Sequence, residues 1–187
     1  MPDQRPTPDE YAPHQEMYVS LITAPVISTL RAQEAHIRIL PDLIAEEQAS
    51  YRYHEKKWSV RQVLGHMADA ERVYQYRALV LARGGEADLK RWDPDGYVAQ
   101  ANFDERTISE LTHELLQLRR VTSLFFSGLS PAAWARGGTL NGKPLTVRAL
   151  AFIAAGHFQR HMNTLHDRYG VARPQAPVQV SAGAQAG

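Results

Sequence analysis

Two histidines have the spacing that coordination of one metal ion requires. His157 and His161 are four residues apart in the stretch AGHFQRHMNTLHDRYG, so in a helix they lie on one face, one turn apart. At about 100° per residue, Leu150 and Ile153 fall on the same face as these two rings. Two imidazoles on a core-facing side are costly unless their nitrogens have partners, and one metal ion would satisfy both.

A third ligand has to come from elsewhere in the chain, and His66 is the candidate. It shares one side of a predicted helix with Val63 and Val73. A helical bundle that brings His66 against His157 and His161 would give three nitrogen ligands and an open position, which is typical of catalytic rather than structural zinc sites. The spacing leaves a second interpretation open, in which His66 is an ordinary hydrogen-bonded residue.

Other kinds of site have weaker sequence signals. A ferritin-like di-iron centre needs two Glu-x-x-His motifs, and only Glu110 with His113 provides one. The chain has no cysteine, which excludes disulfides, thiolate ligands and a cysteine nucleophile. No glycine-rich phosphate loop and no Gly-x-Ser-x-Gly motif is present.

Four long helical segments are predicted to position the histidines. A capping box formed by Ser59 and Gln62 begins the second, a box formed by Thr107 and Glu110 begins the third, and Thr146 can cap the fourth. A glycine pair at 84–85 ends the second helix. Strand signals are weak. The predicted helices span about 25–40, 60–83, 107–128 and 146–170.

The connections between these helices are long. About 20 residues separate the second helix from the third and about 15 separate the third from the fourth, whereas antiparallel neighbours usually need about 2 to 8. Long connections indicate a crossover topology, or loops that wall in a site. The expected fold is an all-α four-helix bundle with a crossover connection.

Composition predicts a single soluble domain. The chain has 187 residues and a net charge of +1, with 21 Lys and Arg against 20 Asp and Glu. We expect a flexible N-terminal tail at 1–13, the bundle at 14–170 and a flexible C-terminal tail at 171–187. No apolar run is long enough to cross a bilayer, and the balanced charge argues against nucleic-acid and membrane partners. We therefore expect a cytoplasmic protein, with the Lys56–Lys57 and Arg119–Arg120 pairs facing solvent.

The stretch KWSVRQVLGHMADAERVYQYRALVLARG, followed by AGHFQRHMNTLHDRYG, resembles the DinB/YfiT-like superfamily of metalloenzymes. This resemblance implies a bundle with a swapped connection and a divalent metal, chiefly nickel or zinc, held by His66, His157 and His161. It also implies a homodimer. Many members have another histidine where this chain has Arg160, a difference that leaves the three ligands intact and alters their surroundings.

The resemblance leaves several reactions open. Some members are S-transferases or isomerases that use a low-molecular-weight thiol, and others are hydrolases. A metal ion in a partly dry bundle would make a nucleophile of a water or of a small thiol near neutral pH. We therefore expect a small-molecule substrate. The alternative is a non-catalytic, stress-associated protein that binds the metal or a ligand.

The residues around the predicted ligands also permit two interpretations each. Asp69 lies about 60° from His66 on the helix, where it could orient the imidazole, or it could pair with an arginine such as Arg72. Glu71 faces away and is expected to make a structural contact or to take part in a different interface. Tyr74 is expected in the core or at the border of the cavity. Three tryptophans are expected to act as hydrophobic staples and loop anchors: Trp58, Trp92 and Trp134.

Overall fold

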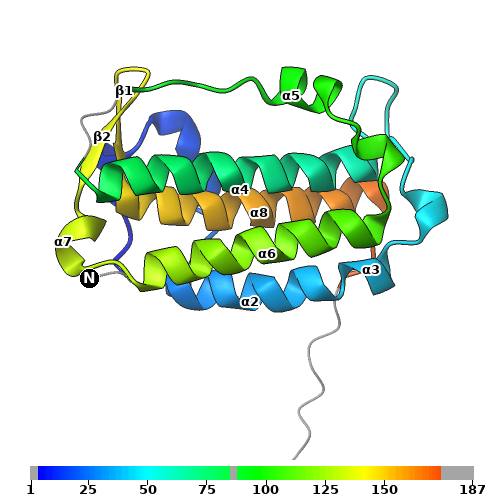
Figure 1. Cartoon of the computed structure of the whole chain (residues 1–187), viewed down its shortest axis with the longest axis horizontal. Helices are drawn as coiled ribbons and strands as arrows, with labels where there is room; N and C mark the ends of the chain where they lie inside the picture. Colours follow the sequence, from blue (N-terminus) through cyan, green and yellow to red (C-terminus); the bar gives the residue numbers. More distant parts are fainter. Residues whose placement is uncertain (1–3, 85–87, 174–187) are drawn as a thin grey trace, which may run out of the picture.

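The computed structural model describes residues 4–84 and 88–173, and four long helices form its centre (Figure 1). The predicted capping boxes begin two of them at Ser59 and Thr107, and the Thr146 hydroxyl caps a third. Gly170, with φ of 71°, ends the last. The all-α four-helix bundle is thus confirmed. Its helices are α2 (Val26–Arg38), α4 (Val60–Ala82), α6 (Ile108–Ser127) and α8 (Val147–Tyr169).

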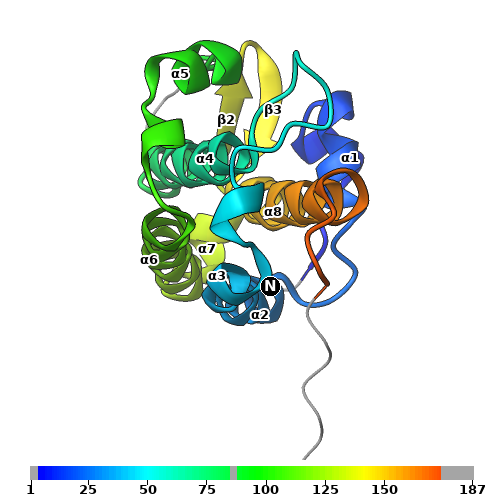
Figure 2. The same ribbon diagram turned by 90° about the vertical axis from the view of Figure 1, so that its right-hand side faces the viewer.

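The four helices are not arranged in chain order. Viewed end-on, they form a square in which α6 lies between α2 and α4, and α8 closes the ring between α4 and α2 (Figure 2). Along the bundle, α4 and α6 run in one direction and α2 and α8 in the other (Figure 1). Two connections therefore join helices on opposite corners, which confirms the crossover topology.

A parallel pair of neighbouring helices explains the longest connection. Because α4 and α6 point the same way, the chain has to travel back along the whole bundle before α6 begins (Figure 1). We call residues 88–107 the return segment. It contains β1 (Asp88–Leu89), α5 (Pro94–Gln100) and the 3-10 helix η4 (Phe103–Glu105), and the last two pack on α4.

A small three-stranded sheet corrects the expectation of little strand structure. Strand β2 (Gly137–Leu140) pairs antiparallel with β3 (Lys143–Thr146) and parallel with β1. The predicted tight turn at Asn141 and Gly142 joins β2 to β3, and both residues have positive φ. Strands of 2 to 4 residues that contain glycine and proline are too short to show an alternating apolar pattern.

Short helices lie at the ends of the bundle and, in the case of α1, along the side of α8. Helix α2 stops before Pro41, as proline requires, and the chain then enters α3. No helix in the described ranges is both long and apolar enough to cross a bilayer. The short helices are α1 (Glu16–Val19), α3 (Leu40–Leu43), α7 (Pro131–Trp134) and the 3-10 helices η1 (Pro8–Glu10), η2 (Pro13–Gln15) and η3 (Glu46–Gln48).

The described part of the expected N-terminal tail lies against the bundle. Arg5 donates hydrogen bonds of 3.1 Å to the carbonyls of Val19 and Ile22, and Glu10 pairs with Arg148 of α8 at 3.2 Å. Tyr11 is only 4% exposed. Residues 4–13 are thus anchored, a difference that follows from buried contacts that composition does not reveal. Three ranges lie outside the described residues: 1–3, 85–87, and 174–187 of the expected C-terminal tail.

A buried polar cluster links all four long helices. Glu71 of α4 and Arg119 of α6 form an ion pair of 2.5 Å, and both side chains are almost fully buried. Thr122 donates to Glu71 at 2.6 Å, while Arg119 donates to Gln33 of α2 at 2.9 Å. Gln33 in turn donates to the carbonyl of Ala155 in α8 at 2.9 Å. The expected structural contact of Glu71 is confirmed. The expectation that Arg119 faces solvent is wrong, because these partners satisfy its charge inside the core.

We expect Arg119→Leu to lower the free energy of unfolding by about 3 to 5 kcal/mol, since it leaves the Glu71 carboxylate buried without its counter-charge. The double variant Glu71→Leu, Arg119→Leu removes both charges and should recover much of that loss. Urea denaturation of the wild type, the two single variants and the double variant measures the coupling. Additive losses would contradict a coupled buried pair.

Candidate metal centre

Three imidazole rings meet between α4 and α8. The Nε2 atom of His157 lies 3.1 Å from Nε2 of His66 and 3.1 Å from Nε2 of His161. One nitrogen from each ring lies within 4.8 Å of the other two. The structure therefore brings together the three residues that the sequence singled out.

Two glycines let other segments approach the helices beside these histidines. Gly65 and Gly156 each directly precede a cluster histidine. A Cβ atom on Gly156 would lie 2.1 Å from the carbonyl oxygen of Tyr18, and one on Gly65 would lie 2.3 Å from the ring of Phe103. Helix α1 and the return segment can thus touch the helix backbones directly. The repeated Gly-His pair was a sequence signal that the spacing analysis did not use.

Aromatic rings surround the cluster. The indole of Trp92, in the return segment, stacks on His66 with 5.5 Å between ring centroids and an interplanar angle of 3°. Trp58 lies 4.6 Å from His66 on the same measure, and Tyr74 lies 5.4 Å from His157. Trp58 and Trp92 were expected to be staples and loop anchors. They also wall the site, and only the packing of distant segments reveals this.

The structure does not bring Asp69 to His66. The Asp69 carboxylate accepts a hydrogen bond of 3.3 Å from Arg72, which is the second of the two interpretations that the sequence left open. Within the described residues, Nδ1 of His66 is buried and has no hydrogen-bond partner. Metal-binding histidines usually donate this second N–H to an acceptor, which fixes the orientation of the ring. In His66 the packing of aromatic rings fixes it instead.

The other histidine of the same stretch lies outside the cluster. Nδ1 of His166 lies 2.8 Å from the carbonyl oxygen of Val171, and its ring stacks on His36 at 6.0 Å. His166 is half-buried and is not one of the three clustered histidines.

All three cluster imidazoles have lowered pKa values. Burial, which penalises the charged form, lowers the pKa of His66 to about 3 and that of His161 to about 4. The pKa of His157 is well below its ordinary value, first because of burial, then because of its two histidine neighbours and the positive charge of Arg119. The rings are therefore neutral near pH 7, with lone pairs free to bind a cation.

The donor set fits a divalent metal ion. Nitrogens bound to one ion at about 2.0 to 2.1 Å lie about 3.0 to 3.4 Å apart in octahedral or tetrahedral geometry, and two separations in the cluster are 3.1 Å. A neutral imidazole carries one N–H, so three converging Nε2 atoms with one unpartnered Nδ1 are poorly satisfied by hydrogen bonds alone. Imidazole nitrogens suit zinc and nickel.

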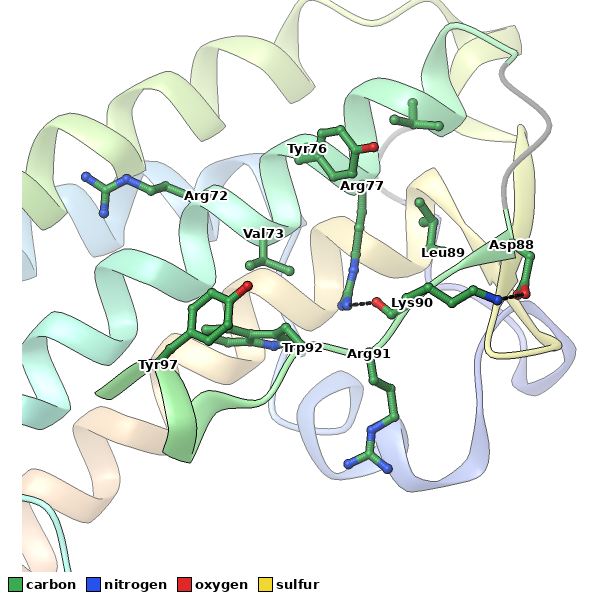
Figure 3. Close-up of a pocket in the computed structure, with 11 residues that line it drawn as sticks. Arg72, Val73, Tyr76, Arg77, Asp88, Leu89, Lys90, Arg91, Trp92 and Tyr97 are labelled. Atoms are coloured by element: carbon green, nitrogen blue, oxygen red, sulfur yellow. Dashed lines mark hydrogen bonds and ion pairs between the residues drawn. The ribbon is translucent and has the colours of Figure 1, made fainter. Parts of the chain in front are cut away.

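The cluster opens to solvent beside His161. His66 and His157 are buried, but His161 is partly exposed and lines a cavity of about 330 Å³. A second groove, of about 690 Å³, is lined by residues of α4 and of the return segment (Figure 3). Of the residues packed on the three histidines, Trp92 also lines this larger groove, and none of the histidines does. The smaller cavity is thus the route to the imidazoles.

Comparison with known proteins places the chain in a family. A family model described as the DinB superfamily matches residues 29–165. The chain belongs to the DinB superfamily. One solved structure that it resembles is YfiT from Bacillus subtilis, described as "a probable metal-dependent hydrolase with an unusual four-helix bundle topology". The likeness has a TM-score of 0.65 and 18% sequence identity, and covers 79% of this chain and 87% of YfiT. No curated protein matches the sequence.

The lowered pKa values predict acid sensitivity of the metal-free protein. An unfolded histidine has a pKa of about 6.5, so between pH 6.5 and about 4 the unfolded chain binds more protons than the folded one. The free energy of unfolding should fall as the pH is lowered through this window, by about 1.4 kcal/mol per pH unit for each ring. Urea denaturation in the presence of a chelator at several pH values measures this slope.

The matched variants are His161→Asn, inside the cluster, and His14→Asn, on the exposed surface. His161→Asn should make the slope shallower by about the contribution of one ring. His14→Asn should leave the slope unchanged. Equal slopes for His161→Asn and the wild type would contradict neutral buried imidazoles.

Proposed function

We propose that the chain is a metal-dependent enzyme that holds one divalent ion, zinc or nickel, through His66, His157 and His161, and hydrolyses a small-molecule substrate. One observation carries this proposal: three neutral Nε2 nitrogens converge on one point beside a cavity that reaches solvent. The description of YfiT as a probable metal-dependent hydrolase supports the choice of reaction.

When bound, such an ion lowers the pKa of a coordinated water from 15.7 to about 7. The chain contributes the surroundings in which this matters. His66 and His157 are buried, and the indoles of Trp58 and Trp92 cover His66, whereas His161 is partly exposed and lines the cavity. If these three nitrogens held a metal ion, His161 would be the ligand nearest to the cavity through which a substrate would enter. Asp95 is the one carboxylate among the residues that line this cavity.

A second reaction, transfer to a small thiol, fits the same cavity. Its volume of about 330 Å³ admits a small thiol as well as a hydrolysable substrate. The chain has no cysteine, so the thiol would be a separate small molecule that enters beside His161. Its sulfur would then be the nucleophile in place of water.

Protein purified without a histidine tag and loaded with zinc or nickel should contain about one ion per chain by mass spectrometry. His157→Ala removes the central nitrogen of the cluster and should abolish this binding. His166→Ala, in the same helix but outside the cluster, should retain it. Full metal content in His157→Ala, or none in the wild type after loading, would overturn the metal site.

The two reactions differ in their need for a thiol. We expect the zinc- or nickel-loaded protein to cleave activated esters or amides without added thiol, and to lose this activity in His157→Ala and after chelation. Turnover of a thiol-reactive electrophile only when a small thiol is present would assign S-transfer in place of hydrolysis. A loaded protein with neither activity against broad panels of both substrates would favour the non-catalytic binding protein.

A further inference from the structure

The charged side chains that line the cavity beside His161 are mainly positive. Three cations line it: Lys56 and Lys57, from the connection between α3 and α4, and Arg160, the residue before His161. Asp95 of α5 is the single carboxylate in its lining. The three cations come from two segments that are about 100 residues apart in the sequence, so the fold concentrates positive charge at the entrance to the histidine cluster.

These three cations are free to bind a ligand. Among the described residues, none of the ion pairs includes Lys56, Lys57 or Arg160, and no carboxylate lies within 4.0 Å of their charged groups. All three side chains are exposed, so their charges are carried without a burial penalty. A cleft with one dominant sign of charge raises the local concentration of the opposite ion.

In the larger groove, by contrast, several cations have partners within the protein (Figure 3). There Arg72 forms ion pairs with Asp69 and Glu114. Lys90 pairs with Asp88, and Arg77 donates to the carbonyl oxygen of Lys90 at 2.7 Å. Two of the four cations that line that groove, Arg72 and Lys90, are therefore paired with carboxylates, and Arg77 is held by a backbone carbonyl.

The walls of the smaller cavity add an apolar surface. Tyr53, Trp58 and Tyr169 line it, and the rings of Tyr53 and Tyr169 pack edge-to-face at 5.0 Å. The Tyr169 hydroxyl donates to the carbonyl oxygen of Trp58 at 2.7 Å, which fixes these two walls to each other. At about 330 Å³ the cavity is at the lower end of the range for ligand sites, about 300 to 1,000 Å³, so its ligand is small.

We infer that this cavity binds a small anionic molecule whose carboxylate or phosphate group contacts Lys56, Lys57 and Arg160, and whose other end points toward His161. Guanidinium and ammonium groups bind both kinds of anion. The inference rests on the proposed function only for the role of that other end, which would be the reacting part of the substrate. The anion-binding part of the site needs no metal.

The first test uses the full chain without metal. Succinate and glycerol 3-phosphate are titrated into it at low ionic strength by calorimetry, and the probe that binds more tightly identifies the preferred anionic group. The variant Lys56→Gln, Arg160→Gln should weaken binding about tenfold. The matched variant Lys90→Gln, Arg91→Gln, which removes two cations from the larger groove, should leave it unchanged. Added salt should weaken binding to the wild type.

The second test uses zinc-loaded protein and compares mercaptosuccinate, which has two carboxylates, with uncharged 2-mercaptoethanol. The variant Lys56→Gln, Arg160→Gln should weaken the binding of mercaptosuccinate about tenfold. It should leave the binding of 2-mercaptoethanol and the zinc content unchanged. This separates the two proposals, because a wrong metal site would abolish zinc binding while succinate or glycerol 3-phosphate still bound the metal-free chain.

Two results would overturn the inference while leaving the metal site intact. One is the absence of binding of both anions to the wild type at 10-millimolar concentrations, on the order of the weakest affinities that calorimetry resolves. The other is an equal loss of binding in the two double variants, which would mean that the cations act only through the net charge of the protein.

Discussion

The ion pair between Glu71 and Arg119 is the constraint on which the rest of the bundle depends. Two charges removed from water are tolerated only when their partners are fixed in place, and here those partners come from every long helix. This buried polar cluster of Glu71, Arg119 and Gln33 sets the rotation of α4 and α8 about their axes. Glu71 follows His66 by five residues and Ala155 precedes His157 by two, so the same rotation aims the imidazoles at one another.

Much of the fold and the ligand set could be predicted because the signals are local. A capping box is read within four residues, and Ser59 and Thr107 begin their helices where these boxes place them. The pairing of His157 with His161 follows from helical geometry alone. His66 could be placed on the apolar side of its helix, but its distance from the other two rings depends on how α4 packs on α8.

The features that the sequence did not reveal depend on contacts between distant segments. Arg119 looks like an ordinary surface cation until Glu71 and Gln33 are brought beside it. The stacking of Trp92 on His66 requires the return segment to lie on α4. Composition cannot show the direction in which two neighbouring helices run, and the parallel arrangement of α4 and α6 decides where that segment goes.

The parallel arrangement has a consequence for how proteins with this topology can diversify. A bundle of antiparallel neighbours can be closed by tight turns, whereas this one has to carry about 25 residues from the end of α4 to the start of α6. That obligatory length crosses the face of the helix that bears His66. Substitutions at its exposed positions can remodel the cover of the histidine cluster, whereas the buried Leu89, Val98 and Phe103 hold the segment to the bundle. Access to the imidazoles can therefore be altered, by evolution or by engineering, at the exposed positions of this one segment.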